Sequence, residues 1–358
     1  MKTLTLKELG YTDTLAQYRA DHKLDSLIVG RVISEHKERY VVKTDTAEYD
    51  AELIGNIRYS AESRYDFPAV GDWVAMLEYD VDKALIHAVF PRHSILERQA
   101  VGRVSQKQII ATNIDYGLIV QSVNRDFNLN RLERYLTICY GAKVEPIIIL
   151  NKIDLIEEEK LAQLLDQIQS RIKEVPVIAM SNQSLQGLDA LTSWIQTGKT
   201  YCLLGSSGVG KSTLLNNLLG KKWMQTTEIN QQIDRGKHTT THRELIVLEK
   251  GGIMIDNPGM REVGTTDASM GLELTFDLIT ELSQACKYKD CTHTTESGCA
   301  ILEAVEKGQL TEDSYYNYQK LQREKAHFEA SVVEKRRKDK EMGKLYKRVK
   351  KERKRKKY

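Results

Sequence analysis

The chain has 358 residues, 41% of them hydrophobic, so it can bury more than one core, and two or three domains are expected. The net charge is only +3, but residues 331–358 hold 15 Lys and Arg against four Asp and Glu, which leaves an acidic body with a basic tail. The N-terminus lacks the apolar core of a signal peptide, and no apolar run reaches the roughly 18 residues that span a bilayer. We therefore expect a cytoplasmic protein with no membrane partner.

The basic tail, residues 331–358, has two interpretations. Clustered positive charge is the usual electrostatic signature of a nucleic-acid partner, so the tail is expected to contact RNA. The alternative is a charged helix that only improves solubility, because many charge runs do nothing more.

Residues 27–98 predict a small β-barrel. They contain five short β-rich runs, LIVGRVI, RYVVKT, AEYDAELI, GDWVAML and ALIHAVF, separated by Gly, Asp, Asn and charged turns. Several short strands with this spacing are typical of a barrel. We treat residues 1–26 as a lead into this domain and residues 99–114 as a linker out of it.

Residues 115–267 change to a rhythm of apolar strands and helices. The expected strands are YGLIVQSV, PIIILNKID, VPVIAMS, TYCLLGSS, ELIVLEK and GIMIDNPG, and helices such as NLNRLERYLTICYG lie between several of them. This alternation predicts a mainly parallel sheet wrapped by helices. Residues 268–330 are predicted to be helical around a cysteine cluster.

A phosphate-binding loop follows the apolar run YCLL and leads into the helical run LLNNLLG. Its sequence, GSSGVGKST, has the P-loop spacing in the strand-to-helix context that the motif requires. Lys211 would act catalytically by reaching the β- and γ-phosphates, and Ser212 would bind Mg²⁺. The alternative is a glycine-rich turn beside a fortuitous Lys-Ser pair. The residues expected to hold the phosphates are Gly205, Ser206, Ser207, Gly208, Val209, Gly210, Lys211, Ser212 and Thr213.

The NKID motif, which begins at Asn151 and follows the strand PIIIL, predicts guanine recognition. The carboxylate of Asp154 can accept both the N1–H and the exocyclic amine of guanine, a pattern that adenine lacks. Asn151 and Lys152 would support the base and the neighbouring loop. The alternative is a turn that caps the next helix. Ser181 and Asn182, in the run SNQ after the next strand, would add a weaker backbone contact to the base.

Two further loops would complete the phosphate and magnesium site. In the run DNPG, Asp256 ends an apolar strand, where P-loop enzymes place a magnesium-binding carboxylate, and the backbone N–H of Gly259 would contact the γ-phosphate. In the run GKHTTTH, Thr239 or Thr240 would bind Mg²⁺. By themselves, both runs could be ordinary loops.

The order of these motifs indicates a circular permutation. Ordinary GTPases place the phosphate loop first and the NKxD motif last, whereas here NKID and SNQ both precede GSSGVGKST. A sheet domain whose termini lie close together tolerates such a rearrangement.

Three of the five cysteines and one histidine predict a structural zinc site. Cys286, Cys291, His293 and Cys299 have the spacing C-x4-C-x-H-x5-C, which supplies four ligands for a closed tetrahedral zinc ion, one per chain. The alternative is three buried thiols beside an incidental histidine. Five unevenly spaced cysteines do not suit a disulfide framework, and the other two, Cys139 and Cys202, are expected in the core.

Taken together, NKID before GSSGVGKST, then GKHTTTH, DNPG and CKYKDCTHTTESGCA, resemble the RsgA (YjeQ) family of ribosome small-subunit-dependent GTPases. VGDWVAM, DFNLNRLERYL and DRGKHTTTHREL add to the resemblance, which covers about residues 27–325. It implies a multidomain protein with an N-terminal all-β OB-fold barrel, a central α/β circularly permuted P-loop GTPase domain and a C-terminal α-helical zinc-binding domain. Two departures are Ser297 in place of Pro before the Gly-Cys pair, and SNQ in place of the usual Ser-Ala of the base loop.

The resemblance implies a GTPase that acts late in small ribosomal subunit assembly, with GTP, GDP and the subunit's rRNA as partners. Met260 stands after DNPG, where many GTPases have a glutamine that orients the attacking water, and a thioether cannot do this. The resemblance implies that His238, the switch histidine of the loop GKHTTTH, takes the catalytic role instead. The alternative for His238 is a loop residue with no catalytic task. The alternative for the whole chain is a GTP-gated RNA-binding module, serving another RNA, in which hydrolysis is incidental. A monomer is expected.

Overall fold

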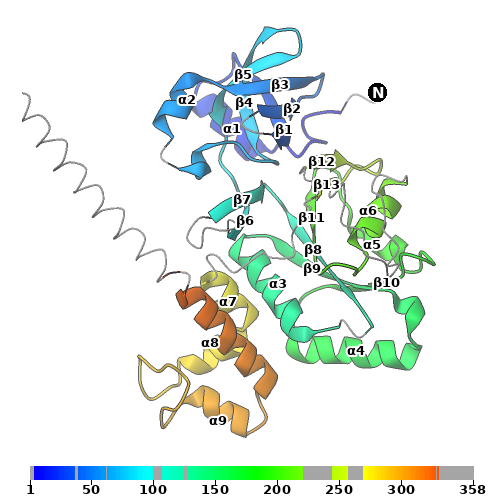
Figure 1. The fold of residues 1–358 in the computed structure, drawn as a ribbon, viewed down its shortest axis with the longest axis vertical. Coiled ribbons are helices and arrows are strands. Elements are labelled where there is room, and N and C mark those ends of the chain that lie inside the picture. Colours follow the sequence, from blue (N-terminus) through cyan, green and yellow to red (C-terminus); the bar gives the residue numbers. More distant parts are fainter. Residues whose placement is uncertain are drawn as a thin grey trace, which may run out of the picture.

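The structure is a computed structural model that describes residues 4–36, 39–61, 63–99, 107–124, 127–220, 244–256, 269–327 and 329. Figure 1 shows a β-barrel, a sheet with flanking helices and a group of C-terminal helices. None of the described helices is long and apolar enough to cross a membrane. The GKHTTTH loop, the DNPG residues after Asp256 and the basic tail lie outside the described residues.

The predicted N-terminal barrel is confirmed. Its strands pair in the order β1-β2-β3-β5-β4, and β4 pairs again with β1, which closes the barrel. A bulge between Val32 and Ser34 lets β1 curve between its two partners. Alternate residues such as Val32, Val42, Met76 and Ile86 fill the interior. The strands are β1 (Ile28–His36), β2 (Arg39–Lys43), β3 (Glu48–Leu53), β4 (Trp73–Asp80) and β5 (Lys83–Val89), with α2 (Gly55–Ser60) and the short helix η1 (Arg64–Asp66) between β3 and β4.

The segment before the barrel is itself folded. It contains α1 (Asp13–Asp21), which begins where the Thr12 side chain accepts a hydrogen bond from the backbone of Leu15. Leu9 and Leu15 pack with Trp73 and Phe90 in a small apolar cluster of their own. The lead therefore covers one side of the barrel.

A buried arginine joins the lead, the barrel and the sheet. The Arg31 guanidinium donates to the carbonyls of Leu9 (2.7 Å), Gly71 (3.1 Å) and Asn113 (3.0 Å) and lies over the Trp73 ring. Burial lowers the pKa of Arg31 to about 10, so it stays charged at neutral pH. Because all three carbonyls belong to different segments, Arg31 fixes the position of the barrel on the rest of the molecule.

The predicted mainly parallel sheet is also confirmed. Its strands lie in the order β10-β9-β8-β11-β13-β12, all parallel except β12, which runs antiparallel to β13 and also meets β1 of the barrel. Cys139 and Cys202 are buried in its core, as expected. The elements are β8 (Tyr116–Ser122), α3 (Leu129–Gly141), β9 (Glu145–Asn151), η2 (Ile153–Leu155), α4 (Glu158–Arg171), β10 (Val177–Met180), α5 (Leu188–Trp194), β11 (Thr200–Leu204), α6 (Lys211–Leu219), β12 (Glu244–Val247) and β13 (Ile253–Asp256), preceded by the hairpin β6 (Ile95–Gln99) and β7 (Lys107–Thr112).

The C-terminal helices pack on α3, the contact that Figure 1 shows beside the sheet. The helices are α7 (Ser269–Thr275), α8 (Asp277–Ser283), α9 (Ala300–Glu306) and residues 312–327. A Cβ on Gly271 would lie 2.1 Å from the Thr137 carbonyl oxygen, so only glycine allows α7 to approach α3 this closely. Glu133 of α3 is buried and accepts hydrogen bonds from Arg171 and from Asn317 of the last helix. The C-terminal helices are therefore attached directly to the sheet domain.

Candidate nucleotide and zinc sites

The phosphate loop lies at the carboxyl edge of the sheet, between β11 and α6. Parallel strands bring their carboxyl ends to one edge, so β9 and β10 deliver NKID and SNQ to the same place. Gly208 and Gly210 have φ values of +79° and +102°, a backbone conformation that strongly favours glycine. Gly208 and Gly210 therefore stand at two positions where the turn of the loop requires a positive φ.

Lys211 is the first residue of α6 and lies across the loop. Its ammonium donates to the carbonyls of Gly205 (2.8 Å) and Ser206 (2.5 Å). Ser212 and Thr213 follow in the first helical turn, and all three side chains are partly exposed. The positive end of the α6 dipole and its free N–H groups are suited to hold anionic phosphates at this point.

The NKID motif is bonded directly to the phosphate loop. The buried Asn151 amide donates to the Val209 carbonyl (2.7 Å), and the Lys152 ammonium donates to the Gly208 carbonyl (2.7 Å). Asp154 lies in η2, with an exposed side chain. Two motifs more than 50 residues apart in the sequence are thus in direct contact.

The SNQ run forms a tight turn against both motifs. The Ser181 hydroxyl accepts the backbone N–H groups of Gln183 and Ser184, each at 3.1 Å. The backbone N–H of Asn182 donates to Asn151 Oδ1 (3.1 Å), and its side-chain amide donates to the Gly210 carbonyl (2.9 Å). Ser181 and Asn182 therefore lie beside the residues that the sequence assigns to the base and the phosphates.

The predicted magnesium, γ-phosphate and catalytic residues lie largely outside the described part of the chain. The backbone of Asp256 ends β13, which pairs in parallel with β11, so it reaches the same edge of the sheet as the phosphate loop. Its side chain is not described. The other predicted residues outside the described part of the chain are His238, Thr239, Thr240, Gly259 and Met260.

Two residues at the site were not predicted from the sequence. Tyr135 of α3 is buried, which raises the pKa of its phenol, and a hydrogen bond to Ser206 of the phosphate loop opposes that shift. Asn217 of α6 donates to the Asn182 carbonyl (3.0 Å). Its signal was the polar Asn-Asn pair inside the apolar run LLNNLLG, whereas Tyr135 looks like an ordinary core residue of an amphipathic helix.

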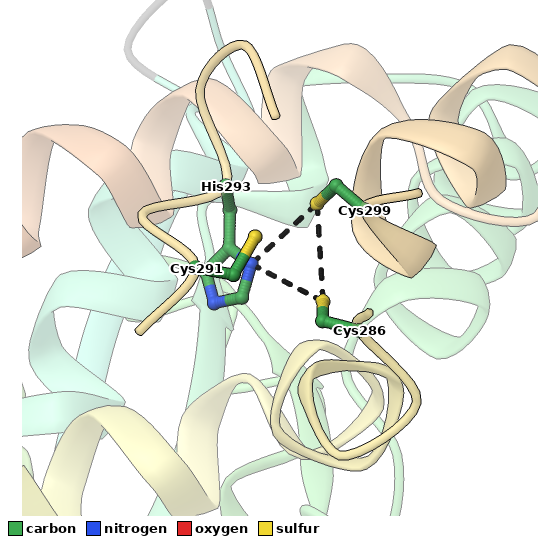
Figure 2. Close-up of side chains that lie close together, drawn as sticks. All are labelled: Cys286, Cys291, His293 and Cys299. Carbon is green, nitrogen blue, oxygen red and sulfur yellow. Dashed lines mark hydrogen bonds between the residues drawn. The ribbon is translucent and has the colours of Figure 1, made fainter. Parts of the chain in front are cut away.

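The four predicted zinc ligands lie together, as Figure 2 shows. The Nδ1 atom of His293 lies 3.5 Å from the sulfur of Cys286 and 3.5 Å from that of Cys299, and these two sulfurs are 3.9 Å apart. With Zn–S bonds of about 2.3 Å and a Zn–N bond of about 2.1 Å, a tetrahedral site has edges of about 3.8 Å between sulfurs and about 3.6 Å between sulfur and nitrogen. The cluster could therefore hold one zinc ion through Nδ1.

The backbone and ring environment of His293 suits a ligand. Its carbonyl accepts hydrogen bonds from the Tyr315 hydroxyl (2.7 Å) and the Gln319 amide (3.3 Å), which connect the zinc loop to the last helix. Burial lowers the pKa of His293, which favours the neutral imidazole that binds metal. Cys299 directly precedes α9 as its N-cap residue and is buried with Ile301 and Ala304 in the core of the C-terminal helices.

Two family models match the chain. The model of the RsgA GTPase covers residues 89–266, and a model described as a 50S ribosome-binding GTPase covers residues 200–347. The second match begins at β11, the strand before the phosphate loop, which is where a GTPase of ordinary motif order would begin. This start agrees with the circular permutation.

Several known proteins are similar to this chain in sequence or in structure. The protein named small ribosomal subunit biogenesis GTPase RsgA 2 from Lactiplantibacillus plantarum is 44% identical over 90% of this chain and 91% of its own length. The crystal structure of YloQ, titled a circularly permuted GTPase, has a TM-score of 0.60 and 25% identity over 86% of this chain and 96% of that one. YjeQ from Thermotoga maritima has a TM-score of 0.62 and 24% identity, with shares of 84% and 98%. With an identity of 44% along nine tenths of its length, the chain belongs to the RsgA family of circularly permuted GTPases.

Proposed function

We propose that this chain hydrolyses GTP to GDP and phosphate and acts late in small ribosomal subunit biogenesis, binding the subunit's rRNA and being stimulated by the subunit. The observation that carries the proposal is the bonding of NKID to the phosphate loop, Asn151 to Val209 and Lys152 to Gly208, because it supports one site for both ends of a guanine nucleotide. The names of the curated relatives support the ribosomal part.

In this proposal the chain's own residues bind and orient the nucleotide. Asp154 reads guanine, Ser181 and Asn182 line the base, and the backbone of residues 205–213 surrounds the phosphates with Lys211 across them. Mg²⁺, when bound, would neutralise charge that develops on the phosphates, and Ser212, Asp256 and Thr239 or Thr240 would hold it. Gly259 would contact the γ-phosphate through its backbone N–H.

The domains would divide the remaining tasks. We propose that residues 27–98 bind RNA, that residues 115–267 bind and hydrolyse GTP, and that residues 268–330 are held by one structural zinc ion. Four protein ligands leave no open position on such an ion, which favours a structural role over a catalytic one. We further propose a cytoplasmic monomer.

Asp154→Asn should weaken GTP binding about 10- to 100-fold, because the loss of a charged hydrogen-bond acceptor typically has that effect. An amide can donate to the carbonyl that xanthine has in place of guanine's amine, so affinity for xanthosine triphosphate should rise. Titration of wild type and variant with both nucleotides measures this change in nucleotide preference. Asp166→Asn, which makes the same change at an exposed position on α4, is the control. Unchanged GTP affinity in Asp154→Asn would remove this residue from base recognition.

Turnover of GTP with and without small ribosomal subunits tests the proposed function. We expect slow hydrolysis by the free protein and a large stimulation by small subunits, with ATP and large subunits as controls. The large-subunit control matters because one matching family model carries the 50S name. A protein that binds GTP and the small subunit without any gain in turnover would instead be a GTP-gated RNA-binding module.

A further inference from the structure

Three successive carbonyls of the phosphate loop are each bonded by a different side chain from the base-recognition motifs. Lys152 donates to Gly208, Asn151 to Val209 and Asn182 to Gly210. A loop that turns its N–H groups toward phosphates turns carbonyls away from them, and the less exposed of these, at Val209 and Gly210, need partners within the protein. The base motifs provide those partners.

Asn182 meets the loop where α6 begins. The Gly210 carbonyl already accepts the first helical hydrogen bond, from the Leu214 N–H at 2.9 Å, so Asn182 occupies its second acceptor position. A Cβ on Gly210 would lie only 2.8 Å from Asn182 Nδ2 and 2.2 Å from Asn151 Nδ2. The two side-chain amides therefore pack so closely against Gly210 that they leave no room for a side chain there.

Asn217 sets the direction of the Asn182 amide. Its side-chain nitrogen donates to the Asn182 carbonyl at 3.0 Å and lies 3.4 Å from Oδ1 of Asn182. With Oδ1 facing this donor, Nδ2 of Asn182 faces the Gly210 carbonyl. Asn217 lies nearly two turns into α6, the helix that follows Gly210. The base loop is therefore bonded both to the phosphate loop, through Asn182 and Gly210, and to the helix after that loop, through Asn217.

We propose that Asn182 is a positioning residue that holds the phosphate loop in its binding conformation, and that Asn217 orients it for this purpose. The proposal rests on the proposed GTP site and assigns Asn182 a task beyond its contact with the base. An alanine, as in the usual Ser-Ala base loop, has no side-chain donor and cannot perform this task. In this chain, the Asn182 side chain adds a third link between base recognition and phosphate binding, beside those of Asn151 and Lys152.

The test compares a nucleotide with a base-free probe. Asn182→Ala and Asn217→Ala should each weaken binding of GDP and of inorganic tripolyphosphate by about three- to tenfold, which is the usual effect of one lost hydrogen bond. The double variant should lose little more than either single one, because both act through the same bond to Gly210. Asn56→Ala, at an exposed asparagine on α2, is the matched control.

Hydrogen exchange of the phosphate-loop amides in the nucleotide-free protein gives a second readout. Exchange at residues 208–211 should accelerate in Asn182→Ala, and also in Asn182→Asp, whose carboxylate has the size of the amide but cannot donate. Weaker GDP binding with unchanged tripolyphosphate binding and exchange would confine Asn182 to the base and overturn the proposal. Unchanged binding of both probes would overturn it as well. Failure of the proposed function would look different, since the wild-type protein would then not prefer GDP to ADP.

Discussion

Cys291→Ser should leave the protein without zinc and unfold the C-terminal helices. A serine hydroxyl stays protonated at neutral pH and is a poor zinc ligand, so the closed site would lose one of its four bonds. Structural zinc contributes about 10 to 16 kcal/mol of apparent binding free energy in zinc-finger peptides, which is as large as the stability of a whole domain. The core that remains is small, and Cys299, one of the four proposed ligands, belongs to it.

The unfolding should extend to the last helix, because Tyr315 and Gln319 both bond the carbonyl of His293. Elemental analysis should find about one zinc per chain in the wild type and none in Cys291→Ser, and limited proteolysis should cut within residues 269–327. Cys139→Ala is the control, because replacing this buried cysteine of α3 can lower the stability of the protein without removing a predicted zinc ligand. An undegraded wild-type protein that is folded and free of zinc would contradict the assignment.

Local patterns of the sequence were enough to predict the sheet and the position of its motifs. Strands buried on both faces appear as continuous apolar runs, and the motif residues follow those runs directly. Asn151 and Gly205 are clear examples, because each ends or follows a strand whose carboxyl end lies at the binding edge. The zinc cluster could be predicted for the same reason, since its four ligands fall within 14 consecutive residues.

Contacts between distant segments could not be predicted in this way. Glu133 would be placed on the exposed face of its helix, yet it is 2% exposed and is bonded to Arg171 and to Asn317, which lies 184 residues away. Arg31 would be taken for a surface residue of a strand, but it is buried by three segments that meet around it. A buried charge of this kind depends on partners that no local pattern reveals.

Asn182 stands between these two cases. Its position after a strand predicted a place near the base, and the structure puts its backbone beside Asn151. Its side-chain bond to Gly210 depends on a turn 28 residues further along the chain. The spacing of a motif therefore predicts which residues lie near a ligand. It does not predict which of these residues form hydrogen bonds with one another.

His238→Ala should abolish most of the GTP turnover that small subunits stimulate while leaving GTP binding intact. General acid–base groups typically contribute 10²- to 10⁴-fold, so we expect a loss of about 10²-fold or more in the stimulated rate. The reasoning starts from Met260, because a thioether cannot orient and polarise water as the glutamine of many GTPases does. Another group must do so, and His238, in the loop GKHTTTH, is the candidate that the family resemblance offers.

The stimulation itself follows if a partner must order this loop before His238 meets the attacking water. Partner-completed sites in other GTPases gain about 10³- to 10⁵-fold, which sets an upper guide for the effect of the subunit. Single-turnover hydrolysis with saturating small subunits, measured beside nucleotide titrations, separates the rate from binding. Met260→Gln is the companion variant and should not rescue His238→Ala, because an amide cannot act as the general acid or base that the imidazole supplies. Full stimulated turnover in His238→Ala would remove this histidine from the mechanism, and rescue by Met260→Gln would show that orientation of water alone is enough.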